Sequence, residues 1–156
     1  MNVHDFDGLT TKFKQLNEEG INRVLRNIAE VVGETLLNNI IEEITRQDLI
    51  DTGTMRNSFA RGDKENVWEW DVDRNAITLE VGSNLGTDPN DPNKWGYPRL
   101  INEGYTIESK KKIGFQATPR TFIGRHYFDI AVKELEGGMN QLIMKRLEIE
   151  LGRLFA

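Results

Sequence analysis

Apolar residues recur every three or four positions over two long stretches, one near each end of the chain. This spacing is typical of an amphipathic helix, so it predicts helices over about 11–45 and 122–155. The first stripe comprises Phe13, Leu16, Val24, Leu25, Ile28, Val31, Val32, Leu36, Ile40 and Ile44. The second comprises Phe128, Ala131, Val132, Leu135, Met139, Leu142, Ile143, Leu147, Leu151 and Leu154.

Glycines interrupt both predicted helices. Gly20 and Gly33 each weaken the first by about 1 kcal/mol relative to Ala, and the stretch 17–20 could split it into a short and a long helix. Gly137 and Gly138 predict a soft spot in the second helix.

Between the helices the period changes to two. Trp68, Trp70 and Val72 alternate with acidic residues, and Ile77, Leu79 and Val81 do the same after a turn at 73–75. Alternation of this kind predicts half-buried strands, here paired as a hairpin. At least one of the two tryptophans is expected in the core rather than on a stacking surface.

The remaining segments are less regular. Residues 54–59 fit either one helical turn or the start of a strand, and residues 97–107 fit a third strand or a short helix. The glycines and prolines of 82–95 predict an exposed loop, of a length that is usually functional or mobile. A second mobile tip is expected at 109–112, then a strand over 113–118 that Pro119 ends, because proline cannot donate to a sheet ladder.

Taken in order, these elements predict one α+β domain over residues 1–156. A long N-terminal helix is followed by a small antiparallel sheet with long loops, and a long C-terminal helix packs on that sheet. A chain of 156 residues is long enough for one hydrophobic core.

Composition and charge argue against several classes of protein. A net charge of −5 and a pI near 5.1 argue against a dedicated DNA or membrane binder. The chain has no cysteine, which excludes disulfides and thiolate metal sites. No apolar run approaches the roughly 20 residues that span a bilayer, and the first ten residues lack a signal-peptide pattern. These features predict a cytosolic protein that does not insert into a membrane.

Candidate chemistry is sparse. His4 and His126 have no metal or triad spacing, and Ser58 and Ser83 lack a nucleophile-elbow context. The acidic loop at 88–93 lacks the central glycine and terminal glutamate of a calcium loop. We therefore expect no enzyme activity, no catalytic residue, no cofactor and no metal. The rival interpretation is a small Mg²⁺-dependent nuclease, whose carboxylates would be Glu69, Asp71, Glu80 and Glu103.

Three segments, taken in order, resemble the tail-component family of tailed double-stranded DNA phages and prophages. Asp-Thr-Gly-Thr-Met-Arg-Asn-Ser-Phe at 51–59 is similar to a signature that follows the family's first long helix, with Met55 where Leu is usual. Residues 77–84 and 97–105 resemble its Val-Gly-Ser-Asn strand end and the following Tyr- and Gly-containing stretch. Here the insert is long, Pro98 replaces a small residue and Asn102 shifts the pattern. Ala-Thr-Pro-Arg-Thr-Phe-Ile at 117–123 resembles the family's entry into the last helix.

The resemblance implies a structural virion protein that joins capsid and tail as one subunit of a homo-oligomeric ring at the neck or tail-completion position. Portal, neck and tail proteins would be its partners, and DNA would pass through without sequence-specific binding. A tail terminator, or a minor capsid or tail-tube subunit, is the alternative. An acidic subunit suits the passage, since a lumen lined with Lys or Arg would retain DNA.

The resemblance also marks residues for folding or assembly. They are Asp51, Thr52, Gly53, Arg56, Ser58, Gly82, Glu103, Gly104, Pro119 and Phe122. At these positions Gly53 and Gly82 are expected to allow sharp turns, Arg56 to pair with Glu103, and Phe122 to anchor the last helix. The candidate partner contacts in loops are Asp88, Asp91, Trp95, Lys110, Lys111 and Lys112. The three lysines could contact DNA phosphates or an acidic partner, although a solvated tip is the simpler interpretation.

Overall fold

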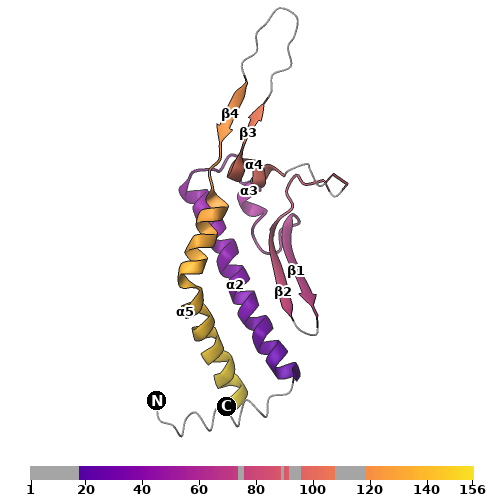
Figure 1. Ribbon diagram of the computed structural model, residues 1–156, viewed down its shortest axis with the longest axis vertical. Helices are drawn as coiled ribbons and strands as arrows, with labels where there is room; N and C mark the ends of the chain where they lie inside the picture. Colours follow the sequence, from indigo (N-terminus) through magenta and orange to yellow (C-terminus); the bar gives the residue numbers. More distant parts are fainter. Residues whose placement is uncertain (1–17, 74–75, 89, 92–95, 108–118) are drawn as a thin grey trace, which may run out of the picture.

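The order of elements is that of an α+β domain, as the sequence predicts. The computed structural model describes residues 18–73, 76–88, 90–91, 96–107 and 119–156 (Figure 1). Its elements are α2 (Glu18–Arg46), α3 (Thr54–Asn57), β1 (Asn66–Val72), β2 (Ile77–Ser83), α4 (Tyr97–Glu103), β3 (Gly104–Ile107), β4 (Arg120–Ile123) and α5 (Tyr127–Phe155). The sequence left two segments undecided between helix and strand. The first contains a helical turn at 54–57, and the second contains a short helix at 97–103 followed by a strand at 104–107. The first part of the N-terminal helix prediction, residues 11–17, lies outside the described residues.

The two long helices lie side by side, and the β1–β2 hairpin flanks α2 (Figure 1). We expected the C-terminal helix to pack on the sheet, but its main neighbour is α2, which lies between it and the hairpin. Helix α5 also runs unbroken through Gly137 and Gly138, the predicted soft spot. None of the helices in the described ranges is long and apolar enough to cross a membrane.

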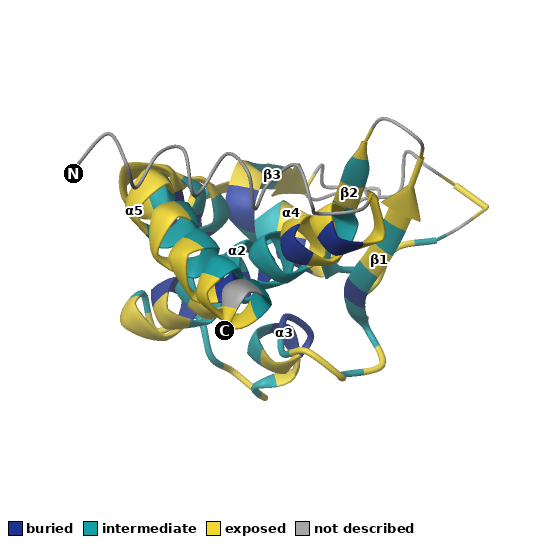
Figure 2. Cartoon of the chain, turned by 90° about the horizontal axis from the view of Figure 1, so that it is seen from below, coloured by how far each residue is buried: buried dark blue, intermediate teal, exposed yellow. Residues whose placement is uncertain are grey.

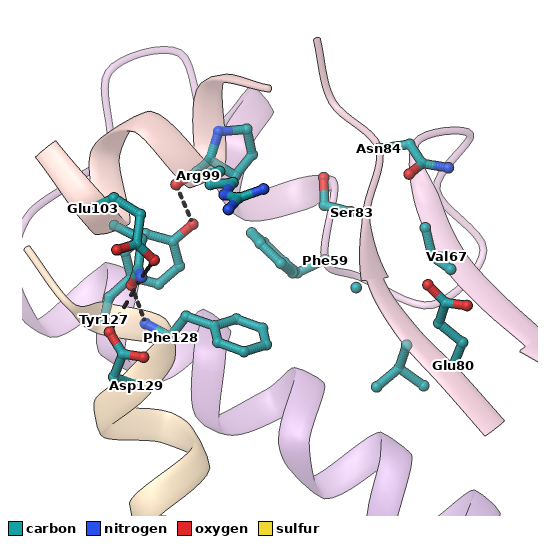
Figure 3. A pocket seen from close by; sticks show the side chains of 14 residues that line it. Phe59, Val67, Glu80, Ser83, Asn84, Arg99, Glu103, Tyr127, Phe128 and Asp129 are labelled. Carbon is teal, nitrogen blue, oxygen red and sulfur yellow. Dashed lines mark hydrogen bonds between the residues drawn. The ribbon is translucent and has the colours of Figure 1, made fainter. Parts of the chain in front are cut away.

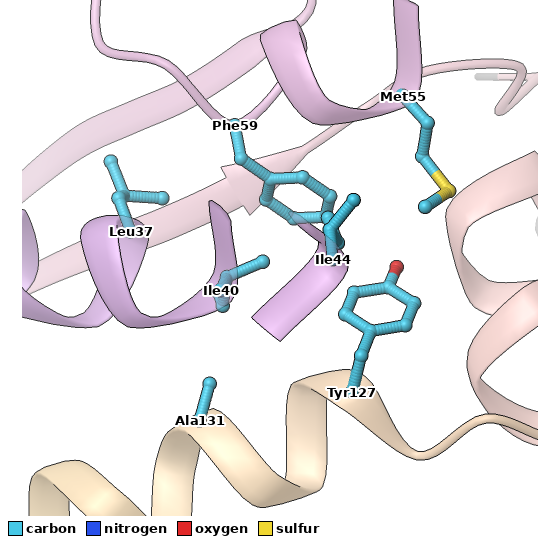
Figure 4. Close-up of a cluster of buried hydrophobic side chains, with 7 residues drawn as sticks. All are labelled: Leu37, Ile40, Ile44, Met55, Phe59, Tyr127 and Ala131. Atoms are coloured by element: carbon cyan, nitrogen blue, oxygen red, sulfur yellow. The ribbon is translucent and has the colours of Figure 1, made fainter. Parts of the chain in front are cut away.

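The core lies where the second half of α2 meets α3 and the first turns of α5 (Figure 4). Ile40 and Ile44 are fully buried there, and the rings of Phe59 and Tyr127 meet edge to face with centroids 6.2 Å apart. Such aromatic pairs add about 0.5–1.5 kcal/mol beyond the area they bury. The first half of α5 buries Tyr127, Ala131 and Leu135, whereas the only described buried residue in its second half is the charged Glu150. Figure 2 colours the chain by burial. The stabilising apolar burial is therefore concentrated at one end of the helix pair.

Gly33 has a packing role that outweighs its low helix propensity. A Cβ at Gly33 would lie 2.8 Å from Leu79 Cδ2 and 3.2 Å from both Trp68 Cη2 and Val81 Cγ1. The hairpin, in which Trp68 faces Val81, therefore rests directly on the helix at the point where the side chain is missing. Trp68 is half-buried against the core, as predicted, whereas Val72 at the far end of the same face is 45% exposed.

A second, separate hairpin replaces the predicted start of the last helix. Residues 120–123 form β4, which pairs antiparallel with β3, and α5 begins only at Tyr127. The prediction that Phe122 anchors the last helix is therefore wrong. Pro119 stands just before β4, a position that needs no ladder donor. The strand expected over 113–118 lies outside the described residues.

Candidate functional site

The first and second motif segments meet in a hydrogen bond between two serines. Ser58, at the end of α3, is only 1% exposed, and its Oγ donates to the carbonyl of Met55 at 2.7 Å. Ser83, at the end of β2, donates to Ser58 Oγ at 2.8 Å and accepts from the backbone N–H of Leu85 at 3.1 Å. Because both hydroxyl protons are used within the fold, the serines join α3 to β2.

Asn66 completes this joint, although sequence reasoning did not select it. Its side-chain amide donates to the carbonyl of Phe59 at 3.3 Å and to that of Gly82 at 3.0 Å. One side chain at the start of β1 thus holds the ends of two other segments. No local pattern marks it, because its partners are 7 and 16 positions away in the chain.

Of the two glycines expected at sharp turns, only Gly53 is in one. Its φ of 79° is left-handed, and its carbonyl accepts the N–H of Asn57 at 2.9 Å, which starts α3. The flanking residues Asp51 and Thr52 are exposed, and the hydroxyl of Thr52 lies 2.7 Å from that of Thr54. The expectation for Gly82 is wrong: it lies inside β2, opposite Val67 on the adjacent strand.

Asn102 holds the start of α5, although the sequence marks it only as a departure from the family pattern. It is 5% exposed, and its Oδ1 accepts the N–H of Phe128 at 2.9 Å. Its Nδ2 donates to Glu103 Oε1 at 3.1 Å and to Asp129 Oδ2 at 3.2 Å. The N–H groups of a first helical turn have no partner within the helix. Asn102 therefore caps α5 from a different element, α4.

Two glycines cross at the base of the β3–β4 hairpin. A Cβ at Gly104, where φ is 84°, would lie 2.6 Å from both Gly124 N and Phe122 O. A Cβ at Gly124 would lie 2.5 Å from the carbonyl oxygen of Asn102. The chain segments entering and leaving the hairpin therefore touch backbone to backbone. The sequence marks Gly104 through the motif, while Gly124 was missed.

The predicted pair of Arg56 and Glu103 does not form, although both residues are described. The prediction placed them on one sheet, whereas they lie on two separate short helices. Arg61, rather than Arg56, links distant segments through its side chain. It pairs with Glu34 and, at 2.6 Å, with Glu30, and its guanidinium lies 4.1 Å from the ring centroid of Trp68. The hydrogen bond with Glu30 is the main cause that raises the pKa of Arg61.

A cleft of about 490 Å³ opens between β2, α4 and the start of α5 (Figure 3). We call it the β2 cleft. Its apolar lining is Phe59, Val67, Val81, Pro98, Tyr127 and Phe128. Its other lining residues are Glu80, Gly82, Ser83, Asn84, Arg99, Asn102, Glu103 and Asp129, so carboxylates outnumber bases three to one.

Buried Tyr127 closes the inner side of the β2 cleft. Its hydroxyl donates to the carbonyl of Pro98 at 2.9 Å. Burial is the main cause that raises the pKa of this phenol, and Tyr97 adds to it. The phenol therefore stays protonated and fixes α5 to α4 at neutral pH.

The four carboxylates of the nuclease interpretation do not gather at one point. Glu69 faces Glu80 across the β1–β2 hairpin, and Glu103 lines the β2 cleft together with Glu80. Within the described ranges, no three His, Asp or Glu residues form a group that could hold a metal ion.

The remaining candidates lie at the periphery. Asp88 and Asp91 form a tight turn, in which Asp91 N–H donates to the carbonyl of Asp88 at 3.1 Å. Pro119 is exposed, and Phe122 stacks on Tyr105 with ring centroids 4.7 Å apart and planes at 16°. Trp95, Lys110, Lys111 and Lys112 lie outside the described residues.

Comparison with known proteins gives one relative of unknown role. The chain is 27% identical over 135 residues to a Bacillus subtilis (strain 168) protein called "Uncharacterized protein YqbI". The alignment covers 85% of this chain and 74% of that protein. The chain matches no family model and no solved structure.

Proposed function

We propose that this protein is a structural subunit of a tailed-phage or prophage particle, which assembles into a ring where the capsid joins the tail. The three motif segments support the proposal, because their described residues serve architecture. Ser58 and Ser83 join the first segment to the second, and Gly104 packs on Gly124 just after the third. Such residues would be kept in a family whose members share a shape rather than a reaction.

The observation that carries the proposal is the exposed β3–β4 hairpin, which we call the arm (Gly104–Ile107 and Arg120–Ile123). It stands away from the helices (Figure 1), with Ile107 50%, Phe122 43% and Ile123 86% exposed. An isolated two-stranded hairpin is marginally stable in water. Ile107 and Phe122 share one face of the arm, and exposed apolar side chains that lie together mark interaction surfaces. The arm is thus better suited to a partner than to solvent.

A projecting arm also suits ring formation. When one part of a subunit binds a different part of an identical neighbour, the contact repeats from copy to copy, and it gives a closed ring where the rotation between neighbours returns to the start. The net charge of −5 is compatible with DNA passing through such a ring without being held. The neighbours of the ring would be the portal, neck and tail proteins of the particle.

The test is a mass measurement of the protein alone, then with purified portal complexes and with purified tails. We expect a ring-sized multiple of 17.9 kDa that joins one of the two complexes, or a monomer that assembles on one of them. Assembly on isolated tail tubes alone would indicate the tail-terminator alternative. As a control, Glu136→Gln on the exposed side of α5 should give the same mass and the same binding to both complexes as the wild type. A protein that binds neither complex, whether as a ring or as a monomer, would refute the proposal.

A further inference from the structure

We propose that the arm of one copy docks in the β2 cleft of a second copy, with β4 lying along the free edge of β2. This contact rests on the proposed function, because it would be the repeated contact of the ring. Four observations support it: an unpaired strand edge, the chemistry of the arm, the distribution of charge along the chain, and the direction of the arm.

The edge of β2 next to the β2 cleft has free backbone groups. The hydrogen bond from Asn84 N to Glu65 O, at 2.8 Å, shows which cross-strand pairs of the β1–β2 ladder are hydrogen-bonded. Every second pair from there is hydrogen-bonded, and the pairs between them are not. Alternate residues of β2, including Leu79 and Val81, therefore direct N–H and C=O away from β1. The sheet has two strands, and no described residue pairs with this edge. An open edge of this kind accepts an added strand through backbone hydrogen bonds.

One face of the arm has the side chains that such a cleft would bind. The register places Tyr105 opposite Phe122, and Ile107 opposite Arg120, all on one face. Three apolar groups and one guanidinium thus lie together on the arm. The β2 cleft offers the complementary set, an apolar inner lining and a rim with Glu80, whose cross-strand neighbour is another glutamate. Like charges opposite each other destabilise a strand pair, so a cation docked there would reduce the repulsion between the two glutamates.

The distribution of charge favours a second copy as the occupant. Arg120 is the only charged residue on the two described strands of the arm, whereas three carboxylates and one base line the β2 cleft. Opposite charges on two surfaces favour association and orient it. The chain itself therefore supplies both an apolar arm with a guanidinium and an acidic cleft.

The arm does not fit the cleft of its own chain. At its base the backbones of Gly104 and Gly124 are in direct contact, so the hairpin has little freedom to bend there. From this base it points away from β2 (Figure 1). An intermolecular contact uses both surfaces without moving the base.

The contact can be tested by cross-linking two singly substituted proteins, because the chain has no natural cysteine. One protein carries Ile107→Cys on the arm. The other carries a distinguishing tag and Asn84→Cys on the cleft rim, at an exposed side chain. They are mixed with a short bismaleimide cross-linker. A third protein, Glu136→Cys on exposed α5, replaces the Asn84 variant as the control. We expect mixed dimers with the Asn84 variant, at least about tenfold more than with the control.

A charge exchange provides a second measurement. Arg120→Glu and Glu80→Arg should each raise the dissociation constant for self-association by about tenfold, and the double variant should return to within about threefold of the wild type. Lys133→Glu, the same kind of change at an exposed site on α5, should have little effect. Circular dichroism should confirm that each variant is folded.

The outcomes separate the two proposals. Oligomers that form without the Ile107–Asn84 cross-link, or that cross-link equally to the control, overturn the docking and leave the ring subunit standing. A specific cross-link in a protein that joins neither portal nor tail supports the docking and refutes the phage function. A monomer that neither cross-links nor binds either complex refutes both.

Discussion

Gly124 and Gly137 should respond in opposite directions to the same substitution by alanine. At Gly124 the new Cβ would lie 2.5 Å from Asn102 O and 2.6 Å from Glu103 C, whereas at Gly137 nothing lies within 4 Å. The atoms in the way at Gly124 are backbone atoms, so a side-chain rotation cannot relieve the clash. At Gly137 the methyl group would project into open space from the middle of α5.

The two effects can be estimated separately. The distance from the new Cβ at position 124 to Asn102 O would have to increase from 2.5 Å to about 3.4 Å, which requires a backbone shift of about 0.9 Å. Overpacking of this kind costs about 1–3 kcal/mol. The shift would also disturb the hydrogen bond from His126 N to Asn102 O, now 3.1 Å long. At Gly137, Ala is favoured over Gly by about 1 kcal/mol in a helix interior. The two variants should therefore differ by about 3 kcal/mol in the free energy of unfolding.

Urea unfolding followed by far-ultraviolet circular dichroism measures this difference. With an m-value of about 1–3 kcal/mol/M, Gly124→Ala should lower the midpoint by about 1 M and Gly137→Ala should raise it. Unchanged m-values would show that stability, rather than the unfolded state, has changed. If Gly124→Ala is as stable as the wild type, the two segments do not cross as closely as described, and the argument for a fixed arm fails with it.

Three further sets of substitutions test the contacts made by Asn102, by the serine pair and by Tyr127. Asn102→Ala should lower the free energy of unfolding by about 1–2 kcal/mol through loss of the α5 cap. Asn102→Asp keeps the accepting oxygen but places a buried carboxylate 3.1 Å from Glu103 and 3.2 Å from Asp129, so it should lose at least as much in the same urea assay. Ser58→Ala and Ser83→Ala should show a coupling energy of about 1 kcal/mol in a double-mutant cycle, and additive effects would contradict their hydrogen bond. Burial raises the pKa of Tyr127 above its ordinary value near 10, so the stability that this phenol contributes is complete below about pH 10 and is lost as pH rises further. Tyr127→Phe should therefore flatten the alkaline limb of the stability profile, and an unchanged limb would refute a buried phenol.

The parts of the fold that the sequence predicts are those set by local periodicity. The three-to-four spacing that ends at Ile40 and Ile44 follows the buried face of α2, and alternation around Trp68 and Trp70 follows β1. In each case neighbouring residues share one environment, so a short window contains the needed information. Residue type and spacing alone are therefore enough to predict α2 and β1.

The start of α5 shows why the rest could not be predicted. Phe122 and Ile123 fit a helical stripe as well as a strand, and only their pairing with Tyr105 and Gly104 decides for the strand. The cap of α5 likewise comes from Asn102, 26 residues before its partner Phe128. Gly33 was interpreted as a weakness because propensity is local, whereas its contacts with the hairpin are not. Each of these errors concerns a contact between distant segments.

The same distinction explains why the motif residues and the proposed contact residues differ. Ser58, Ser83 and Gly104 satisfy contacts inside one chain, so one fold is enough to constrain them. The exposed residues of the arm contribute little to that fold, and any constraint on them must come from a neighbour. The two sets meet at Gly104 and Gly124, where packing fixes the direction of the arm. Ring closure requires a fixed rotation between subunits, so a joint that protects the fold would also set the geometry of assembly.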